Sequence, residues 1–359
     1  MTNETYNLVI VGYGGMGSYH AKLLKENQTI KVIGTFDILE ERREASQADG
    51  YKVYESYSAV LSDRDVDLIL IATPNEVHKE IAIAALVAKK HVICEKPVTI
   101  YSEDLEEVIE VAEANDCKFV VHQNRRWDKD FLTVKKIYDK RMIGSVFHIE
   151  SRVQGANGIP GDWRHLKTHG GGMLLDWGVH LLDQLLFMVD SKIASVYANL
   201  SFVLGDEVDD GFQTIITFEN GCTALIEVGT TNFIQLPRWY VKGTAGTAVI
   251  EDWNITGKIV TQNFGVDIEA PKPIQAGQGL TKTMAPPSEA AVSTSELPEV
   301  EPAMEGFYDN VISVIEGKAD PIVKNTEVLR VLRLIETIFK AAEMNEVIKD
   351  FDSYKGELV

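Results

Sequence analysis

The sequence predicts an α/β protein in which a doubly wound parallel sheet precedes an α+β domain with a large, mainly antiparallel, open sheet. Short apolar runs alternate with helical segments up to about residue 122, which is the pattern of a parallel sheet covered by helices. Longer runs with a two-residue period follow, separated by turn signals such as Glu219-Asn220-Gly221. We therefore divide the chain into residues 1–122 and 123–359.

Composition limits the possible partners. The 359 residues, 45% of them hydrophobic, are enough for two packed cores. A formal charge of −19, from 35 basic and 54 acidic residues, argues against nucleic acid or an anionic membrane as a partner. Three cysteines without CxxC spacing indicate neither a disulfide framework nor a metal site. No apolar run approaches the length of a membrane helix and no signal peptide is evident, so we expect a soluble, cytoplasmic protein.

A glycine-rich turn follows the first apolar run, at residues 6–11. The turn has the form GxGxxG and leads into a helical segment at residues 18–26. The first glycine permits a tight turn, the second lets the backbone approach a pyrophosphate, and the third allows close packing of helix on strand. The pyrophosphate of a dinucleotide then lies at the helix N-terminus. The candidate cofactor-binding residues here are Gly12, Tyr13, Gly14, Gly15, Met16 and Gly17.

The second strand, at residues 31–36, ends at Asp37, which is 20 residues beyond Gly17. A carboxylate there can accept hydrogen bonds from both ribose hydroxyls and repels a 2′-phosphate, so it favours NAD over NADP. Arg42 and Arg43 leave NADP possible, because they could bind a 2′-phosphate if the loop folds back. The alternative is that both arginines are solvated residues of the next helix.

The next two strands end in polar residues at the edge where parallel sheets bind ligands. The strand at residues 67–72 runs into Thr73 and Asn75, and His78 begins the following helix. For His78 we weigh a cofactor contact equally with an exposed or helix-capping role. The strand at residues 91–94 stops at Glu95-Lys96-Pro97, and the proline fixes the Lys96 ammonium at the strand end. The candidate cofactor contacts at this edge are Thr73, Asn75, His78, Glu95 and Lys96.

The remaining elements follow from the same patterns. The first domain is completed by helical segments at 79–89 and 102–115 and a strand at 118–121. The second domain has a helix at 131–140, strands at 146–153, 193–203, 212–218, 223–228 and 239–242, and final helices at 305–316 and 326–344. Residues 265–300 are rich in Pro, Ser, Gly and Ala and predict a long surface loop that could cross onto a partner subunit. A sheet with helices on one face leaves the other uncovered, so we expect a homodimer or homotetramer built through the C-terminal sheet.

A mostly apolar helical segment follows the triplet of glycines at 170–172. Its exceptions, Asp176, His180 and Asp183, have the i, i+4, i+7 spacing that places them on one side of a helix. Burying them without partners would cost on the order of 2–7 kcal/mol for each polar group, so they form either a structural network or an active site. The glycine triplet favours the active site, because it lets backbone or cofactor come close to the start of the helix.

Three dispersed motifs resemble those of one family. The GxGxxG turn, the Glu95-Lys96-Pro97 strand end and the helix with Asp176 and His180 are similar, in this order and across essentially the whole chain, to the Gfo/Idh/MocA family. Its name joins glucose-fructose oxidoreductase, inositol dehydrogenase and rhizopine catabolism. Residues 124–133 and 163–164 resemble the scyllo-inositol dehydrogenase-like branch. That branch often prefers NADP, an expectation from which Asp37 departs.

The resemblance implies hydride transfer between a secondary alcohol of a sugar or polyol and a nicotinamide, with Lys96, Asp176 and His180 as catalytic residues. Independent chemistry agrees, because a neutral histidine can take the hydroxyl proton near pH 7 and a lysine can stabilise the developing alkoxide. Asp176 would orient the imidazole or hold a substrate hydroxyl, and Asp183 would support the site from behind. Candidate substrate contacts are Asn124, Arg125, Trp163, Arg164, Asp176 and His180, the first four with interdomain packing as the alternative.

Two functions of other classes stay open. Some relatives use bound NAD to cleave a glycosidic bond, and a nucleotide-sensing regulator could keep the fold without catalysis. We interpret His20, His91, His122 and His148, which lie in helix or strand patterns, as structural. We expect no metal, because His165 and His169 are too loosely spaced and lack nearby acidic ligands.

Overall fold

The computed structural model describes residues 5–265, 272–282, 287–349 and 351. In the first domain six parallel strands form a sheet with the order β3-β2-β1-β4-β5-β6. The strands are β1 (Tyr6–Val11), β2 (Ile30–Phe36), β3 (Lys52–Val53), β4 (Leu68–Ile71), β5 (His91–Cys94) and β6 (Phe119–Val121). The helices are α1 (Gly15–Leu23), α2 (Glu40–Ala48), α3 (Tyr57–Ser62), α4 (His78–Val87) and α5 (Ser102–Ala114). This is the doubly wound fold that the sequence predicted.

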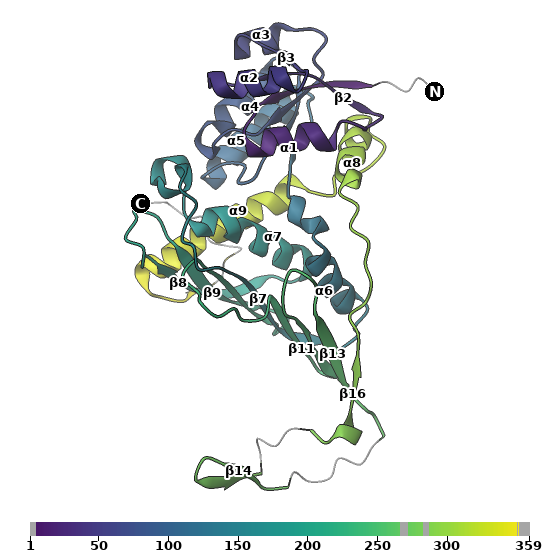
Figure 1. Cartoon of the computed structure of the whole chain (residues 1–359), viewed down its shortest axis with the longest axis vertical. Coiled ribbons are helices and arrows are strands. Elements are labelled where there is room, and N and C mark those ends of the chain that lie inside the picture. Colours follow the sequence, from purple (N-terminus) through teal and green to yellow (C-terminus); the bar gives the residue numbers. More distant parts are fainter. Residues whose placement is uncertain (1–4, 266–271, 283–286, 350, 352–359) are drawn as a thin grey trace.

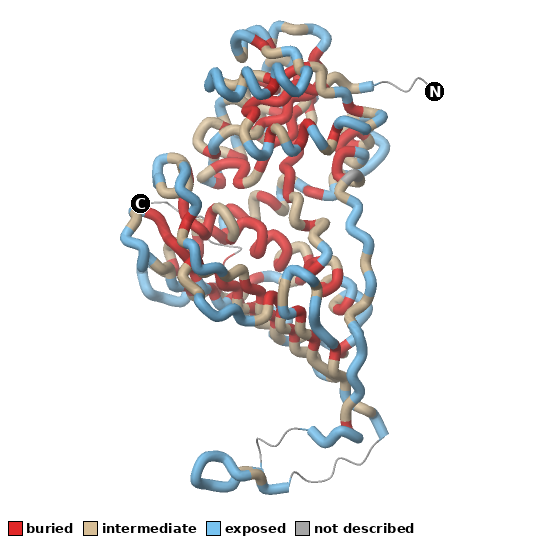
Figure 2. The backbone as a smooth tube through the Cα atoms, in the orientation of Figure 1, coloured by how far each residue is buried: buried red, intermediate tan, exposed pale blue. Residues whose placement is uncertain are grey.

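The apolar runs form the centre of this sheet. Every residue of β4 is buried, and the residues at the centre of β1 have no exposed surface, as expected for strands covered by helices on both faces. Figure 2 shows the buried backbone concentrated in this sheet and in the helical layer above the second one. The short strand β3 and the short helix α3 were not predicted, because neither has enough residues to show a period.

The second domain contains a nine-stranded sheet with the order β16-β13-β12-β11-β7-β10-β9-β8-β17. Only the pair β7 and β10 is parallel, which confirms the mainly antiparallel prediction. The strands are β7 (Val146–Gln154), β8 (Ile193–Ser201), β9 (Gly211–Phe218), β10 (Thr223–Gly229), β11 (Trp239–Gly243), β12 (Gly246–Ile250), β13 (Gly257–Gln262), β16 (Val292–Ser295) and β17 (Ile348–Lys349). The helices α6 (Lys129–Asp139), α7 (Val179–Met188) and α9 (Asn325–Met344) lie between this sheet and the first domain (Figure 1).

Two segments depart from a simple two-part chain. The helix α8 (Glu305–Ile315) returns to the first domain and lies beside α1 (Figure 1). The segment at 265–300, predicted as a surface loop, contains the edge strand β16 and a hairpin of β14 (Ile274–Ala276) and β15 (Gly279–Thr281). That hairpin projects far from the rest of the chain (Figure 1). Within the described ranges, no helix combines the length and the apolar composition that a membrane span requires.

Candidate active site

The glycine-rich turn joins β1 to α1 and leaves room for a pyrophosphate. A Cβ atom on Gly12 would lie 2.5 Å from the carbonyl oxygen of Ala72, and one on Gly17 would lie 1.9 Å from that of Gly12. These two glycines are therefore required by close packing. A Cβ on Gly14 or Gly15 would meet nothing within 4 Å, so open space lies beside the start of α1, where backbone N–H groups attract anions. The turn fits the pyrophosphate of a dinucleotide.

Asp37 lies where the sequence placed it, at the end of β2 beside this turn. One carboxylate oxygen accepts the backbone N–H of Tyr13 at 2.7 Å, and the other accepts that of Leu39 at 2.8 Å. The Tyr13 side chain is buried and donates to Asp49, so only the backbone of Tyr13 faces the turn. Arg43 folds back and donates to the carbonyl oxygens of Asp37 and the next residue, each at 3.0 Å. This brings the Arg43 guanidinium to the loop of Asp37, the predicted ribose-binding residue.

His78 is not the exposed residue that one interpretation of the sequence expected. It is buried, with 1% of its surface exposed, and its two ring nitrogens lie 2.8 Å from the Thr73 carbonyl oxygen and 3.1 Å from that of Pro97. A neutral ring donates to only one of them. The side chain thus links the loops after β4 and β5. Nearby, the Thr73 hydroxyl is buried without a partner, and Asn75 donates to the Gly170 carbonyl at 3.3 Å.

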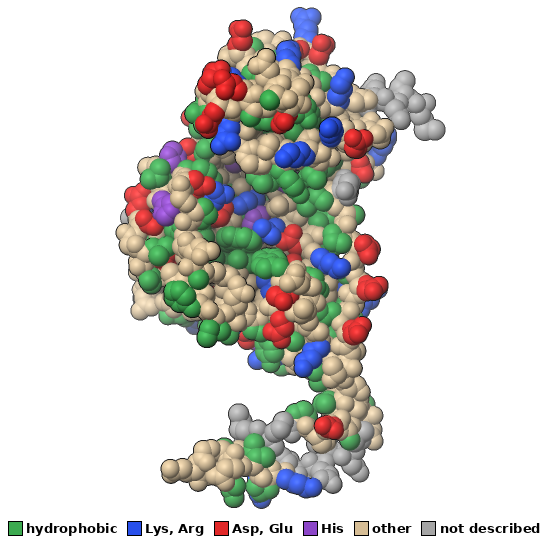
Figure 3. All heavy atoms as spheres, viewed as in Figure 1, with side chains coloured by type: hydrophobic (Ala, Val, Ile, Leu, Met, Phe, Trp, Pro, Cys, Tyr) green, Lys and Arg blue, Asp and Glu red, His purple; other side chains and the backbone are tan. Residues whose placement is uncertain are grey.

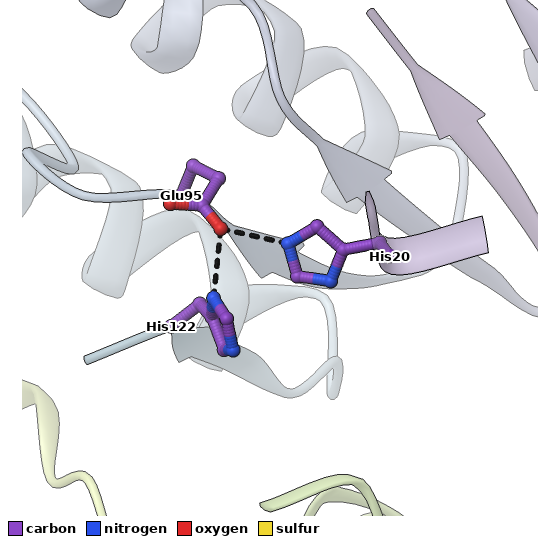
Figure 4. A group of neighbouring side chains, drawn as sticks. All are labelled: His20, Glu95 and His122. Atoms are coloured by element: carbon purple, nitrogen blue, oxygen red, sulfur yellow. Dashed lines mark hydrogen bonds and ion pairs between the residues drawn. The ribbon is translucent and has the colours of Figure 1, made fainter. Parts of the chain in front are cut away.

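Glu95 was predicted to contact the cofactor, and the structure shows that it points elsewhere. Its Oε1 lies 2.7 Å from Nε2 of His20 in α1 and 2.7 Å from Nδ1 of His122 after β6 (Figure 4). The Tyr308 hydroxyl in α8 lies 2.6 Å from Nδ1 of His20. His20, Glu95 and His122 each offer an atom that could bind a metal. Their separations of 2.7 Å are, however, those of charge-assisted hydrogen bonds. We assign a buried hydrogen-bonded network that joins α8 to the first domain.

Lys96 and Asp176 meet across the two domains. The Lys96 ammonium donates to Oδ1 and to the main-chain oxygen of Asp176, both at 3.1 Å, and Nε of Arg164 lies 3.2 Å from Oδ2. Burial alone would raise the pKa of Asp176, but the charges of Lys96 and Arg164 outweigh it and hold that pKa below its usual value. The carboxylate is therefore ionised and fixes the lysine at the end of β5.

His180 lies on α7, one turn beyond Asp176. The ring is 4% exposed, and its Nδ1 is buried with no partner among the described residues. Burial, followed by the charges of Lys96 and Arg125, lowers the pKa of His180 well below its usual value. The imidazole is neutral at neutral pH, as a general base must be. Trp177 contacts the ring edge-on, with centroids 5.9 Å apart.

The third polar residue of this helix belongs to a separate network. Asp183 accepts two hydrogen bonds from Arg126 at 2.7 and 2.8 Å, and Arg126 also donates to Glu327 of α9 at 2.8 Å. A π-helical turn, Leu174–Gly178, precedes α7 and carries Asp176, whereas His180 and Asp183 both lie in α7. The predicted single stripe divides because Arg126 binds Asp183. Asp183 thus supports the helix rather than facing the site.

The glycine triplet before the π-helical turn is required by the chain itself. A Cβ on Gly171 would lie 2.3 Å from the Arg164 carbonyl oxygen, and one on Gly172 would lie 2.3 Å from Oδ1 of Asp209. Asp209 accepts the Leu174 N–H at 2.8 Å and so caps the turn that carries the site. Burial raises the pKa of Asp209 to about 7.

The predicted substrate contacts divide between the cleft and its rim. Oδ1 of Asn124 and Nε of Arg125 are buried without partners, and the Arg125 guanidinium lies 4.1 Å from the Trp177 ring centroid. Trp163 packs on the Arg164 guanidinium at 4.7 Å, and the structure shows no contact of this ring with His180 or Lys96. Figure 3 shows the surface hollowed between the two domains, with basic and histidine side chains in the hollow.

Sequence reasoning missed two aromatic residues at this cleft. Trp177 contacts His180, and Trp253, from the turn after β12, lies 6.1 Å from the Trp177 ring. The signal for Trp177 was present, since it lies between Asp176 and His180, but an aromatic in an apolar helix is usually core. Nothing in the local sequence distinguishes Trp253 from a surface residue.

Two family models match the chain. The oxidoreductase family with an NAD-binding Rossmann fold matches residues 6–123, and the Gfo/Idh/MocA C-terminal domain matches residues 131–249. The chain belongs to the Gfo/Idh/MocA oxidoreductase family. It is therefore an oxidoreductase with an NAD-binding domain, as the motifs implied.

Proteins at several levels of sequence identity resemble the chain. The crystal structure of an NAD-binding protein from Listeria innocua is 61% identical, with a TM-score of 0.93, over 97% of this chain and all of the other. An uncharacterized oxidoreductase of Schizosaccharomyces pombe is 30% identical over 83% of this chain and 85% of its own length. Myo-inositol 2-dehydrogenase of Thermotoga maritima is 27% identical over 61% of this chain and 66% of its own.

Proposed function

We propose that this protein is an NAD(P)-dependent dehydrogenase that acts on a secondary alcohol of a sugar or inositol. The observation that carries the proposal is the contact of Lys96 with Asp176 at the end of β5, one helical turn before His180, where the two domains meet. Thr73, Asn124 and His180 each carry a buried polar atom that has no partner among the described residues. Such atoms are costly unless a ligand satisfies them. The resemblance to inositol 2-dehydrogenases supports a polyol as that ligand.

Each residue has a chemical task in this proposal. Neutral His180 takes the proton of the substrate hydroxyl. The Lys96 ammonium donates a hydrogen bond to the same oxygen and stabilises the charge that develops on it. Asp176 holds the ammonium in place, and its side chain is 11% exposed, so water competes little with the contact. NAD, when bound by the first domain, accepts the hydride.

The test is a panel of inositols and aldoses offered with NAD or NADP, followed by the absorbance of the reduced nicotinamide. A dehydrogenase accumulates reduced cofactor in proportion to the alcohol oxidised. Release of a sugar from a glycoside without net reduced cofactor would indicate an NAD-dependent glycosidase instead. Cofactor binding without turnover of any polyol or glycoside would indicate a regulatory protein.

We also infer a homo-oligomer assembled through the open face of the nine-stranded sheet. This face is more polar than the sequence suggested. His148, Glu150 and Arg152 alternate along β7, and Arg152 bonds to both Glu150 and Glu227 of β10. Arg152 and Glu227 are only 7% and 9% exposed. Light scattering at micromolar concentration tests the assembly, and a monomeric mass would contradict it.

A further inference from the structure

A buried carboxylate lies directly behind the candidate catalytic lysine. Glu95 precedes Lys96 at the end of β5, and successive side chains of an extended chain point to opposite sides. Lys96 reaches the cleft and Asp176, whereas Glu95 reaches His20 and His122 in the interior (Figure 4). The Lys96 backbone N–H also donates to Oε2 of Glu95 at 3.2 Å.

This carboxylate is charged. Burial alone would raise the pKa of Glu95, but the contacts with His122 and His20 outweigh burial and hold that pKa well below its usual value. The titratable groups that face it are His20 of α1, His78 of α4, His122 after β6, His180 of α7, Tyr308 of α8 and Cys94 of β5. A fixed charge in such an interior is weakly screened, so it acts on groups beyond its own contacts.

The charges that face His180 oppose one another. Lys96, Arg125 and His122 disfavour its protonated form, whereas Glu95 favours it. A lysine that stabilises an alkoxide therefore also weakens the base beside it. A negative charge behind the lysine offsets that effect without entering the cleft.

We propose that Glu95 is a positioning residue of the active site, whose fixed charge offsets that of Lys96 at His180 and keeps the imidazole basic enough to accept the substrate proton. The inference rests on the proposed function only in naming His180 as the base. It also gives the network of His20, His122 and Tyr308 a task, which is to hold this charge in place without water.

The test is a pH titration of the His180 ring by NMR, in the full-length protein with labelled histidines and saturating NAD. All variants are made in a Lys96→Met background, because removing the Lys96 charge moves the midpoint of the His180 titration to higher pH. Adding Glu95→Gln should lower the midpoint by roughly one pH unit, the scale of a nearby buried charge. Adding Glu95→Asp, which keeps the charge, should lower it much less. The His180 signal is assigned by its absence from His180→Ala.

A matched control separates charge from packing. Tyr308→Phe removes a hydroxyl from the same network without removing a charge, so it should lower the melting temperature and leave the His180 midpoint in place. Bound NAD stabilises each variant by mass action and keeps it folded through the titration. An unchanged midpoint in Glu95→Gln, or an equal shift in Tyr308→Phe, would overturn the proposal. The titration needs no turnover, so it can refute the role of Glu95 while the polyol assay supports the proposed activity. It can equally support the role of Glu95 when no polyol is turned over.

Discussion

Replacing His180 by alanine should remove the general base while leaving the fold and the cofactor site intact. General bases contribute roughly 10²–10⁴ in rate, so kcat should fall by that factor, or about 3–5.5 kcal/mol. The ring is 4% exposed and its Nδ1 has no partner among the described residues, so truncation breaks no hydrogen bond of that atom. We therefore expect a modest change in melting temperature and nearly unchanged NAD affinity, since the first domain holds NAD.

The assay follows reduced nicotinamide with the polyol that the panel identifies, next to NAD binding and thermal melting of the same samples. Asp183→Ala, on the same helix, is the matched control. It leaves Arg126 buried without its bidentate partner, and breaking such a pair costs about 3–5 kcal/mol of stability. Its main effect should be a lower melting temperature. A His180→Ala protein that turns over polyol at near the wild-type rate would refute the assignment of the base.

The pH profile gives a second reading of the same residue. The neutral ring is the active form, so kcat/KM for alcohol oxidation falls as the pH drops through the pKa of His180. Burial, Lys96 and Arg125 lower that pKa, so the limb should lie below the usual range of histidine, and the profile should be flat from near neutrality upward. The limb should be absent from His180→Ala. A limb centred above pH 7 would contradict the electrostatics of the site.

Four further changes test other parts of the account. Lys96→Ala should reduce kcat about as much as His180→Ala, because it removes the charge aimed at the alkoxide, and it should also weaken NAD binding. Asp37→Ala should narrow the preference for NAD over NADP by losing ribose hydrogen bonds worth about 1.5–3 kcal/mol; a wild-type protein that strongly prefers NADP would show that Asp37 is not in the ribose pocket. Gly17→Ala should lower the melting temperature, because its Cβ would lie 1.9 Å from a carbonyl oxygen. Gly14→Ala should fold normally, because its Cβ would meet nothing within 4 Å, but it should lose NAD affinity, because the methyl group would take the space expected for the pyrophosphate. Equal melting temperatures of the two variants would contradict this packing. Burial raises the pKa of Asp209 to about 7, so the folded state favours the protonated carboxyl, and the stability that this group contributes at low pH is lost as the pH rises through 7. Asp209→Asn should therefore raise the melting temperature, relative to wild type, more at pH 8 than at pH 5. The opposite order would contradict this reasoning.

The fold was predictable wherever one element carries its own pattern. The strands of the first sheet are continuous apolar runs, and the GxGxxG turn fixes how the first strand meets its helix. The helix boundary was less certain, because α1 begins at Gly15 rather than at the predicted Ser18. Glycine has a low helix propensity, and here close packing on the strand overrides it.

The site was predictable in its residues but not in its directions. Lys96 and Asp176 are in contact, with His180 one turn further along the helical segment, whereas Asp183 and Glu95 bind other partners. The first error arose because Arg126, the partner of Asp183, lies 57 residues away in the chain. The second arose because a partner such as His20 lies 75 residues from Glu95, and no local pattern records that distance. Pairings set by tertiary packing are the part that a single sequence does not show.

The most direct test of the central claim uses a polyol that carries deuterium at the carbon to be oxidised. If Lys96, Asp176 and His180 form a site for hydride transfer, one deuterium should appear on the nicotinamide for each alcohol oxidised, and neither Lys96→Ala nor His180→Ala should form labelled cofactor at a comparable rate. Turnover of the substrate with no deuterium on the released cofactor, or labelling at an unchanged rate in both variants, would contradict the account.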